Sequence, residues 1–295
     1  MDTLLIFGAA GQLGAECAAL FRDRFRLVPL DLADLDVGDP GQCRAALELH
    51  RPDIVLNCAA YTRVDDAESR PALARAVNAV APGVMAEWTE TRQAMLVHIS
   101  TDFVFDGAKP PPDMYVEDDQ PNPLSVYGQT KLEGEKAIRE RTGRFAILRT
   151  AWLYGRTGAN FPKTMLRLAQ AQPERTLRVV NDQLGSPTCA WRLARQIARV
   201  LEARATGLFH ASSDGACTWH DFACAFLDAM DIPHRIVPCS TADYPTPARR
   251  PPNSVLRNRA LQEAGLDLMP DWREDMAAFA QRHREAILEE TRSNP

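Results

Sequence analysis

Short, mostly apolar runs alternate with amphipathic stretches through the first half of the chain. The apolar runs are Thr3–Phe7, Arg26–Leu30, Ile54–Asn57, Met95–Ile99 and Phe145–Arg149. Runs of this length are typical of strands buried on both faces of a parallel sheet. Helical periodicity follows at residues 12–23, 40–50, 72–90 and 126–141. This alternation predicts right-handed crossovers and a doubly wound α/β sheet.

The second half of the chain is less regular. Leu177–Val180 and Gly207–Ala211 have the pattern of strands, and we expect both to extend the main sheet. Helices are predicted at 160–172, 189–203, 218–230 and 271–289, and the Pro- and Arg-rich stretch 240–254 is predicted to be an irregular loop. We therefore predict a large sheet domain over 1–150, completed by about 177–211, and a smaller, interleaved C-terminal region of residues 151–176 and 212–295.

Composition and charge exclude several classes of protein. The net charge of -5 repels nucleic acid and anionic membrane, so we predict neither as a partner. The N-terminus lacks a basic signal-peptide region, and no stretch approaches the ~20 apolar residues of a membrane span. The seven cysteines form no CxxC pair, which indicates reduced, mostly buried thiols and no zinc site. These features predict a cytoplasmic protein without a metal site among its cysteines.

A glycine-rich turn follows the first predicted strand and opens the first predicted helix. Gly8, Gly11 and Gly14 are spaced as GxxGxxG, with Gln12 and Leu13 between the last two. Gly8 permits a tight turn, Gly11 lets the backbone approach a pyrophosphate, and Gly14 lets the helix pack closely on the strand. The free N–H groups at the helix start then face the phosphates, so the turn predicts a dinucleotide site.

Residues after the second and third strands are candidates for the rest of that site. Asp31 can accept hydrogen bonds from ribose hydroxyls and disfavours a 2′-phosphate, although a solvated loop carboxylate is the alternative. Asp36 and Val37 can border the adenine, or Asp36 can serve a helix start. Small residues after the third strand leave room for the dinucleotide, namely Ala59 and Ala60, followed by Tyr61.

A tyrosine and a lysine one helical turn apart carry the candidate chemistry. Tyr127 and Lys131 open a predicted helix and share one of its faces. A phenol can donate a proton to a ketone oxygen that gains charge as hydride arrives. A lysine ammonium about 4 Å away favours the phenolate by roughly 4 kcal/mol, or about three pKa units. Thr101, at the end of the fourth strand, would hold the carbonyl oxygen beside Tyr127.

Several motifs together resemble a known family. They are GAAGQLG (8–14), RPDIVLNCAAYTRVDDAE (51–68), STDFVFDG (100–107), YGQTKLEGE (127–135), RTAWLYG (149–155), NDQLGSPT (181–188) and RPPNSVL (250–256). On these the chain resembles the extended short-chain dehydrogenase/reductases and, within them, the dTDP-4-dehydrorhamnose reductase family. The resemblance implies a Rossmann-like doubly wound parallel sheet with a smaller, interleaved C-terminal substrate-binding domain.

The resemblance also implies residue roles. Thr101, Tyr127 and Lys131 would be catalytic. Residues 11–13, 31, 36–37 and 59–61 would contact NADPH or NADH. Thr101, Asp102 and Trp152 would contact the sugar, and Arg250 could face its diphosphate, although Trp152 can equally be a core aromatic and Arg250 a solvated loop residue. One departure is Phe103, where the family usually has Tyr.

Three functions stay open on this resemblance. The first is NAD(P)H-dependent reduction of the 4-keto group of dTDP-4-dehydro-L-rhamnose to dTDP-L-rhamnose, with Tyr127 as the proton donor. The second is a reductase or epimerase of another sugar nucleotide, and the third is a non-catalytic subunit like the regulatory β-subunit of methionine adenosyltransferase. The family includes dimers, some with a divalent cation, so a monomer or homodimer and a Mg²⁺ ion are open. We interpret the acidic residues Glu285, Glu289 and Glu290 as a solvated helix end.

Overall fold

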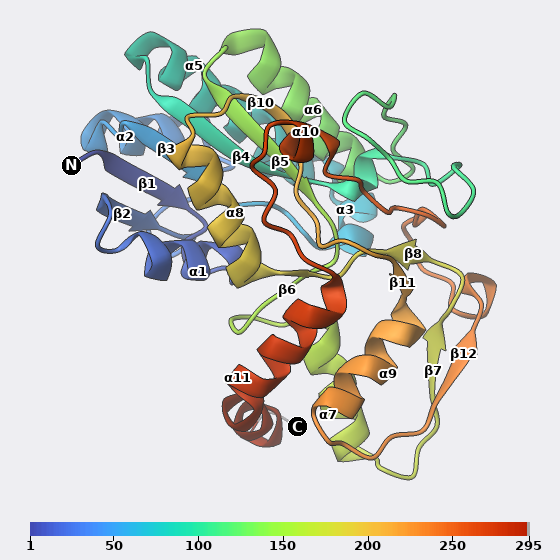
Figure 1. The fold of residues 1–295 in the computed structure, drawn as a ribbon. Coiled ribbons are helices and arrows are strands. Elements are labelled where there is room, and N and C mark those ends of the chain that lie inside the picture. Colours follow the sequence, from blue (N-terminus) through green and yellow to red (C-terminus); the bar gives the residue numbers. More distant parts are fainter. Residues whose placement is uncertain (294–295) are drawn as a thin grey trace.

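The computed structural model describes residues 1–293 and contains a six-stranded parallel sheet (Figure 1). Its strand order is β10-β5-β4-β3-β1-β2, and every neighbouring pair is parallel. The strands are β1 Thr3–Phe7, β2 Arg26–Leu30, β3 Ile54–Asn57, β4 Met95–Thr101, β5 Phe145–Thr150 and β10 Gly207–His210. The predicted doubly wound α/β fold is confirmed. The order reverses at β1, between β2 and β3, and such switch points are where ligands bind in open α/β sheets.

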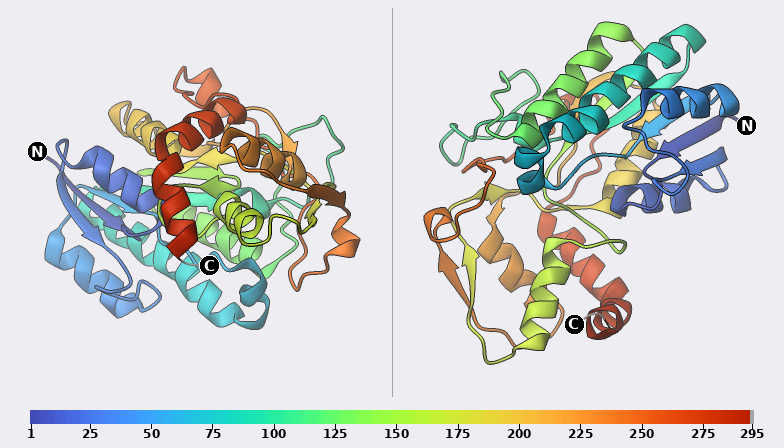
Figure 2. Two further views of the ribbon diagram at one scale, coloured as in Figure 1. Left: turned by 90° about the horizontal axis from the view of Figure 1, so that it is seen from below. Right: turned by 180° about the vertical axis from the view of Figure 1, so that it is seen from behind.

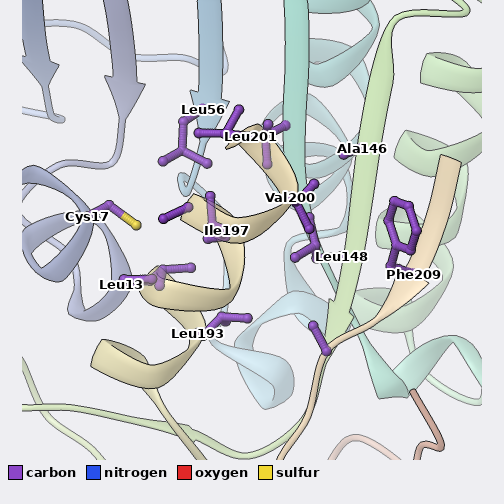
Figure 3. Close-up of a cluster of buried hydrophobic side chains, with 14 of the residues drawn as sticks. Leu13, Cys17, Leu56, Ala146, Leu148, Leu193, Ile197, Val200, Leu201 and Phe209 are labelled. Carbon is purple, nitrogen blue, oxygen red and sulfur yellow. The ribbon is translucent and has the colours of Figure 1, made fainter. Parts of the chain in front are cut away.

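Helices cover both faces of this sheet (Figures 1 and 2). One face packs against α2 Pro40–His50, α5 Ala81–Arg92 and α6 Val126–Arg141, and the other against α1 Gln12–Phe21 and α8 Ala190–Glu202. Figure 3 shows the second layer, in which Leu193, Ile197 and Val200 of α8 point at the sheet. Because both faces are covered, the side chains of the inner strands are mostly buried on either side, whereas the edge strand β2 has Arg26 and Pro29 exposed.

The segment predicted as one helix at 72–90 is helical but divided. It consists of α4 Pro71–Arg75, a π-helical turn η1 Ala76–Val80, and α5. A further short helix, α3 Val64–Ser69, precedes it and was not predicted. Single π-turns inside helices are frequent at functional sites. Here the π-turn carries Asn78, whose side chain exchanges hydrogen bonds with the backbone of Tyr61.

A smaller lobe lies below the carboxyl ends of the strands (Figure 1). Its helices are α7 Phe161–Ala171, α9 Trp219–Ala229 and α11 Trp272–Ser293, and they share one apolar cluster. β7 Leu177–Val180 pairs with β12 Ile236–Cys239 in a separate two-stranded sheet. The expectation that Leu177–Val180 extends the main sheet is therefore wrong. Arg178 is exposed within β7, so this strand has one solvent-facing side, unlike the inner strands of the main sheet.

Short elements connect the two lobes. β6 Leu153–Tyr154 pairs with β9 Thr188–Cys189, and β8 Leu184–Gly185 pairs with β11 Cys217–Thr218. The 3-10 turns η2 Asp102–Val104 and η3 Thr241–Asp243 and the helix α10 Arg259–Glu263 complete the fold. Apart from η3 and short bridges, residues 240–254 are irregular, as predicted. Among residues 1–293 no helix is both long and apolar enough to cross a membrane.

The packing of α8 gives a stability prediction. Ile197 is fully buried between α8 and the sheet, so Ile197→Ala leaves a cavity and should lower the free energy of unfolding by about 2–5 kcal/mol. Leu49→Ala, at a side chain that is 77% exposed, serves as the control and should change it by less than about 0.5 kcal/mol. Urea unfolding measures both. Equal losses for the two variants would contradict this assignment of the core.

Candidate active site

The glycine turn after β1 forms one wall of a cavity. Gly8 has a φ of 76°, and a Cβ added at Gly14 would lie 2.0 Å from the Gly8 carbonyl oxygen, so only glycine allows α1 to start this close to β1. Gly11 is the residue before α1, and no side chain caps the helix. The first N–H groups of α1 are thus left for an outside acceptor, as an anion-binding helix start requires.

The cavity beside this turn has a volume of about 480 Å³. Eight of the predicted cofactor residues line it: Gly8, Gly11, Asp31, Asp36, Val37, Ala59, Ala60 and Tyr61. The other three do not. Leu13 is buried in the core, Gly14 packs against Gly8, and Gln12 accepts a 3.0 Å hydrogen bond from Asn160.

The residues present fit a dinucleotide. The uncapped helix start suits a pyrophosphate, and small residues after β3 leave the cavity open. Asp31 also lines the cavity, and its carboxylate accepts from Ala10 N–H at 2.6 Å and from Leu32 N–H at 2.8 Å. Arg63 also lines the cavity. The hydroxyl of Tyr61, another lining residue, donates a hydrogen bond to Asp66.

The predicted catalytic side chains meet at the carboxyl end of β4. Ser125 caps α6, and a Cβ added at Gly128 would lie 2.1 Å from the Phe103 carbonyl oxygen, so glycine is needed where α6 approaches η2. This contact brings the half-buried Tyr127 beside Thr101, within hydrogen-bonding reach of its hydroxyl. The Phe103 ring packs edge-on against Tyr127, with ring centroids 5.6 Å apart.

Asp102 is a buried carboxyl with an unsatisfied oxygen. Its Oδ1 accepts from the Thr101 hydroxyl at 3.0 Å, while Oδ2 has no hydrogen-bond partner within residues 1–293. Burial raises the pKa of Asp102 to about 6, although the nearby Ser254 and Thr101 hydroxyls oppose the rise. An unsatisfied buried oxygen next to Thr101 is suited to a polar group of a ligand.

Lys131 lies one turn along α6 from Tyr127 and is 2% exposed. Its Nζ donates to the Ile99 carbonyl oxygen at 2.6 Å and lies 3.3 Å from Nε2 of His98. Burial raises the pKa of Tyr127 to about 12, and the Asp102 charge acts in the same direction. The pKa of Tyr127 therefore lies above its ordinary value, contrary to the expectation that Lys131 lowers it, because burial of the phenol dominates.

A buried ion pair holds this part of α6 on the sheet. Glu135, one further turn along α6, accepts from Arg149 of β5 at 2.8 and 2.6 Å, and from the Ser100 hydroxyl of β4 at 2.5 Å. Both charged side chains are no more than 2% exposed. A bidentate arginine–carboxylate pair has a demanding geometry, so it fixes the position of α6 relative to β4 and β5.

A second cavity, of about 630 Å³, lies in the smaller lobe between α7, β7, α9 and the segment that runs from the end of β12 through η3 to Arg250. Trp219, Arg178 and Arg250 are among its lining residues. Trp152 does not line it but stacks on Trp219 with ring centroids 3.5 Å apart, and its backbone φ is 45°. A left-handed backbone at a non-glycine residue is strained, which is common at functional sites.

Arg250 reaches from this cavity toward the sheet domain. Its guanidinium pairs with Asp65 of α3 at 2.7 Å and donates to the Ala248 carbonyl oxygen at 3.1 Å. The Arg250 hydrogen bond holds the pKa of Asp65 below its usual value. The alternative of a solvated loop arginine is therefore wrong, since Arg250 bridges the two lobes.

The described residues contain no cluster of side chains suited to a metal ion. No group of three or more His, Cys, Asp or Glu side chains among residues 1–293 is placed to hold a metal ion. Glu290 instead pairs with Arg156 and, at 2.6 Å, with Lys163. The Mg²⁺ ion left open by the sequence therefore finds no support in the described residues.

Several residues at the site were not singled out from the sequence. They are Asn57, Asn78, His98, Glu135 and Ser254. The available signal was a polar residue inside an otherwise apolar run, as with His98 in β4 and Asn57 at the end of β3. Polar residues are seldom fully buried unless they have partners, so such positions indicate a buried network.

Comparison with known proteins decides the family. A model described as the RmlD substrate binding domain matches residues 1–285. The chain belongs to this family. It is 42% identical over 288 residues to a dTDP-4-dehydrorhamnose reductase from Burkholderia thailandensis, covering 92% of this chain and 95% of that protein. The assignment to the dTDP-4-dehydrorhamnose reductase family made from the motifs is confirmed.

Two further RmlD-type relatives show the range of the likeness. A probable dTDP-4,6-dihydroxy-2-methyloxan-3-one 4-ketoreductase from Streptomyces antibioticus is 43% identical over 274 residues, 91% of each chain. A crystal structure of dTDP-4-dehydrorhamnose reductase from Bacillus anthracis, in complex with NADP, is 35% identical, with a TM-score of 0.91 over 95% of this chain and 99% of that chain. The family is thus one of nicotinamide-dependent sugar-nucleotide oxidoreductases with the extended short-chain dehydrogenase fold.

The buried Asp102 predicts a pH-dependent change in stability. Its folded-state pKa, about 6, lies above the ordinary value of 3.8, so the ionised carboxylate costs the folded state free energy as pH rises between these values. Asp102→Asn removes this titration. Its stability relative to the parent should rise by up to about 3 kcal/mol between pH 4 and pH 7.

Urea unfolding at several pH values measures this difference. Asp113→Asn, at an exposed carboxylate, is the control and should show little change with pH. A stability difference between Asp102→Asn and the parent that is constant from pH 4 to pH 7 would contradict the burial of an ionisable Asp102.

Proposed function

We propose that the protein reduces the 4-keto group of dTDP-4-dehydro-L-rhamnose to dTDP-L-rhamnose with NADPH or NADH, and that Tyr127 is the proton donor. The observation that carries this proposal is the meeting of Thr101, Tyr127 and Lys131 at the end of β4, next to a switch-point cavity of dinucleotide size. The name of the Burkholderia relative supports the choice of sugar.

The proposed cofactor residues hold the dinucleotide in that cavity. The start of α1 at Gly11–Leu13 receives the pyrophosphate, Asp31 the adenosine ribose, and Ala59–Tyr61 the middle of the molecule, with Asp36 and Val37 toward the adenine. The bound nicotinamide supplies the hydride. Gly8 and Gly14 take part only by shaping the turn.

The proposed chemical step uses a proton held by the chain. The raised pKa of Tyr127 keeps the phenol protonated at neutral pH, ready to donate to the carbonyl oxygen as negative charge develops there. The Thr101 hydroxyl, on turning away from Asp102 Oδ1, donates a second hydrogen bond to that oxygen. The phenolate that remains on Tyr127 is then close to Lys131, whose ammonium can return a proton to it.

The sugar and its nucleotide are proposed to extend from Tyr127 into the smaller lobe. Asp102 offers its unsatisfied Oδ2 to a sugar hydroxyl, and Trp152 lies alongside the ring. Arg250, at the edge of the second cavity, is available to the diphosphate by exchanging its partner Asp65 for phosphate oxygens.

A different keto sugar is the second candidate. The Streptomyces relative, 43% identical, is named for a 4-ketoreductase of another dTDP sugar. Both candidates use the same proton donor and differ in the ring substituents that meet Asp102 and Trp152. Product analysis with the two keto sugars separates them, and absence of turnover with any keto sugar despite dinucleotide binding would favour a regulatory role instead.

The proposed proton donor predicts a large loss of rate. Tyr127→Phe removes the phenolic hydroxyl but keeps the ring, so kcat for oxidation of NADH or NADPH with dTDP-4-dehydro-L-rhamnose should fall at least about 100-fold. Absorbance at 340 nm measures the rate, and dinucleotide affinity should change little.

Tyr154→Phe is the matched control. The Tyr154 hydroxyl is buried and has no hydrogen-bond partner within the described residues, so its removal should leave the rate near that of the parent. Retention of most of the kcat in Tyr127→Phe would overturn the assignment of the proton donor.

Asp31 predicts the direction of cofactor preference. Its carboxylate stands at the adenosine end of the cavity, where it repels a 2′-phosphate. Asp31→Asn should therefore lower the KM for NADPH relative to that for NADH by about fivefold, or ~1 kcal/mol for one partly screened charge pair. An unchanged ratio of the two KM values would show that Asp31 does not face the 2′ position.

A further inference from the structure

The register of the sheet brings two buried polar side chains together behind the cofactor cavity. Asn57 of β3 is paired with His98 of β4, so the two side chains lie on the same face of adjacent parallel strands. This is the face covered by α6, and Lys131 reaches down from α6 onto His98. The three side chains are each at most 2% exposed, which makes the direction of every hydrogen bond between them matter.

The direction of these bonds can be followed from the backbone. Ala59 N–H donates to Oδ1 of Asn57 at 3.1 Å, which fixes the orientation of the Asn57 amide. The Asn57 Nδ2 group must then donate to Nδ1 of His98, 3.0 Å away. Burial and the nearby Lys131 hold the pKa of His98 well below its ordinary value, so the ring is neutral. A neutral ring whose Nδ1 accepts carries its proton on Nε2.

That proton is directed at Lys131. Nε2 of His98 and Nζ of Lys131 are 3.3 Å apart, so an N–H donor faces the lysine nitrogen. A neutral amine can accept this hydrogen bond through its lone pair, whereas an ammonium has only donors to offer. Two donors face each other in the ammonium form, and the ionised state of Lys131 is disfavoured.

We infer that His98, held as its Nε2–H tautomer by Asn57, is a positioning residue that destabilises the ammonium form of Lys131 and so makes this lysine a readier proton donor. The role in proton return to Tyr127 rests on the proposed reductase function; the effect on Lys131 itself does not. The series of hydrogen bonds that fixes the His98 tautomer begins at the N–H of Ala59, a residue that lines the cofactor cavity.

Two further ionisable groups act on Lys131. Glu135 acts on it from α6, and Cys58 acts on it from the segment after β3. Glu135 favours the ammonium, but its oxygens are already committed to Arg149 and Ser100. Burial lowers the pKa of Lys131 to about 8 in spite of Glu135 and Cys58, so the His98 donor acts in the same direction as burial.

Nuclear magnetic resonance tests the inference without substrate. Lysines occur only at positions 109, 131, 136 and 163, so a protein labelled with ¹³C at lysine Cε gives four signals, and Lys131→Arg identifies the one from Lys131. We expect its titration midpoint to lie below those of the other three. Long-range ¹⁵N spectra of the six histidines, with the His98 signals identified by their loss in His98→Leu, should show protonated Nε2 and bare Nδ1 for His98.

Two variants and one control complete the test. His98→Leu removes the donor and should raise the Lys131 midpoint by about one pH unit. Asn57→Ser removes the amide that fixes the His98 tautomer and should also raise the Lys131 midpoint. This second variant keeps the inference testable if His98→Leu does not fold. His210→Leu, at another fully buried histidine in the same sheet, should leave the midpoint unchanged.

A bare Nε2 on His98, or an unchanged Lys131 midpoint in folded His98→Leu or Asn57→Ser, would overturn the inference. In active protein, the basic limb of the kcat/KM profile should move to higher pH with the Lys131 midpoint. If no keto sugar is turned over, the magnetic-resonance result still stands, so failure of the reductase proposal and failure of this inference are distinguishable.

Discussion

The position of α6 over the sheet depends on the buried pair between Glu135 and Arg149. Burying two charges costs several kcal/mol, and only a bidentate geometry with the remaining oxygens satisfied compensates for it. Here the Ser100 hydroxyl provides the extra hydrogen bond, so the pair joins α6 to both β4 and β5. Lys131 and Tyr127 lie one and two turns earlier, respectively, on the same helix face. A small rotation of α6 would break the pair, and the pair therefore sets where the phenol and the amine point.

Much of the fold could be predicted because both faces of the main sheet are covered. A strand buried on both sides is a continuous apolar run, and the bounds of β1 and β3 match such runs. The wrong prediction for β7 arises because β7 is not covered on both faces. Its pattern alternates between buried and exposed residues, which is typical of a strand with one solvent-facing side. Its partner β12 begins 56 residues after β7 ends, and the two middle residues of β12 are exposed.

Some residues of the candidate site can be predicted from their close neighbours in the sequence, and others depend on contacts between distant segments. The glycine turn and the Tyr127–Lys131 pair depend on spacing within one turn or one helix, so the sequence alone indicates them. The partners of these residues come from strand register and from packing between lobes. Asn57 meets His98 only because β3 and β4 pair in one particular register, and Asp65 meets Arg250 across 185 residues of sequence. Neither contact produces a periodic pattern in the sequence from which it could be predicted.

Residues 250–254 show how the distant contacts complete the site. Pro252 lies directly over Gly107, where an added Cβ would come within 2.6 Å of it, and Asn253 donates to the carbonyl oxygens of Lys109 and Asp113. The same segment brings Ser254 to Asp102 and Arg250 to Asp65. Polar groups at the end of β4 and on α3 are thus partly satisfied by the C-terminal half of the chain. The RPPNS stretch, residues 250–254, is therefore held against the candidate active site by side-chain contacts and does more than connect neighbouring elements.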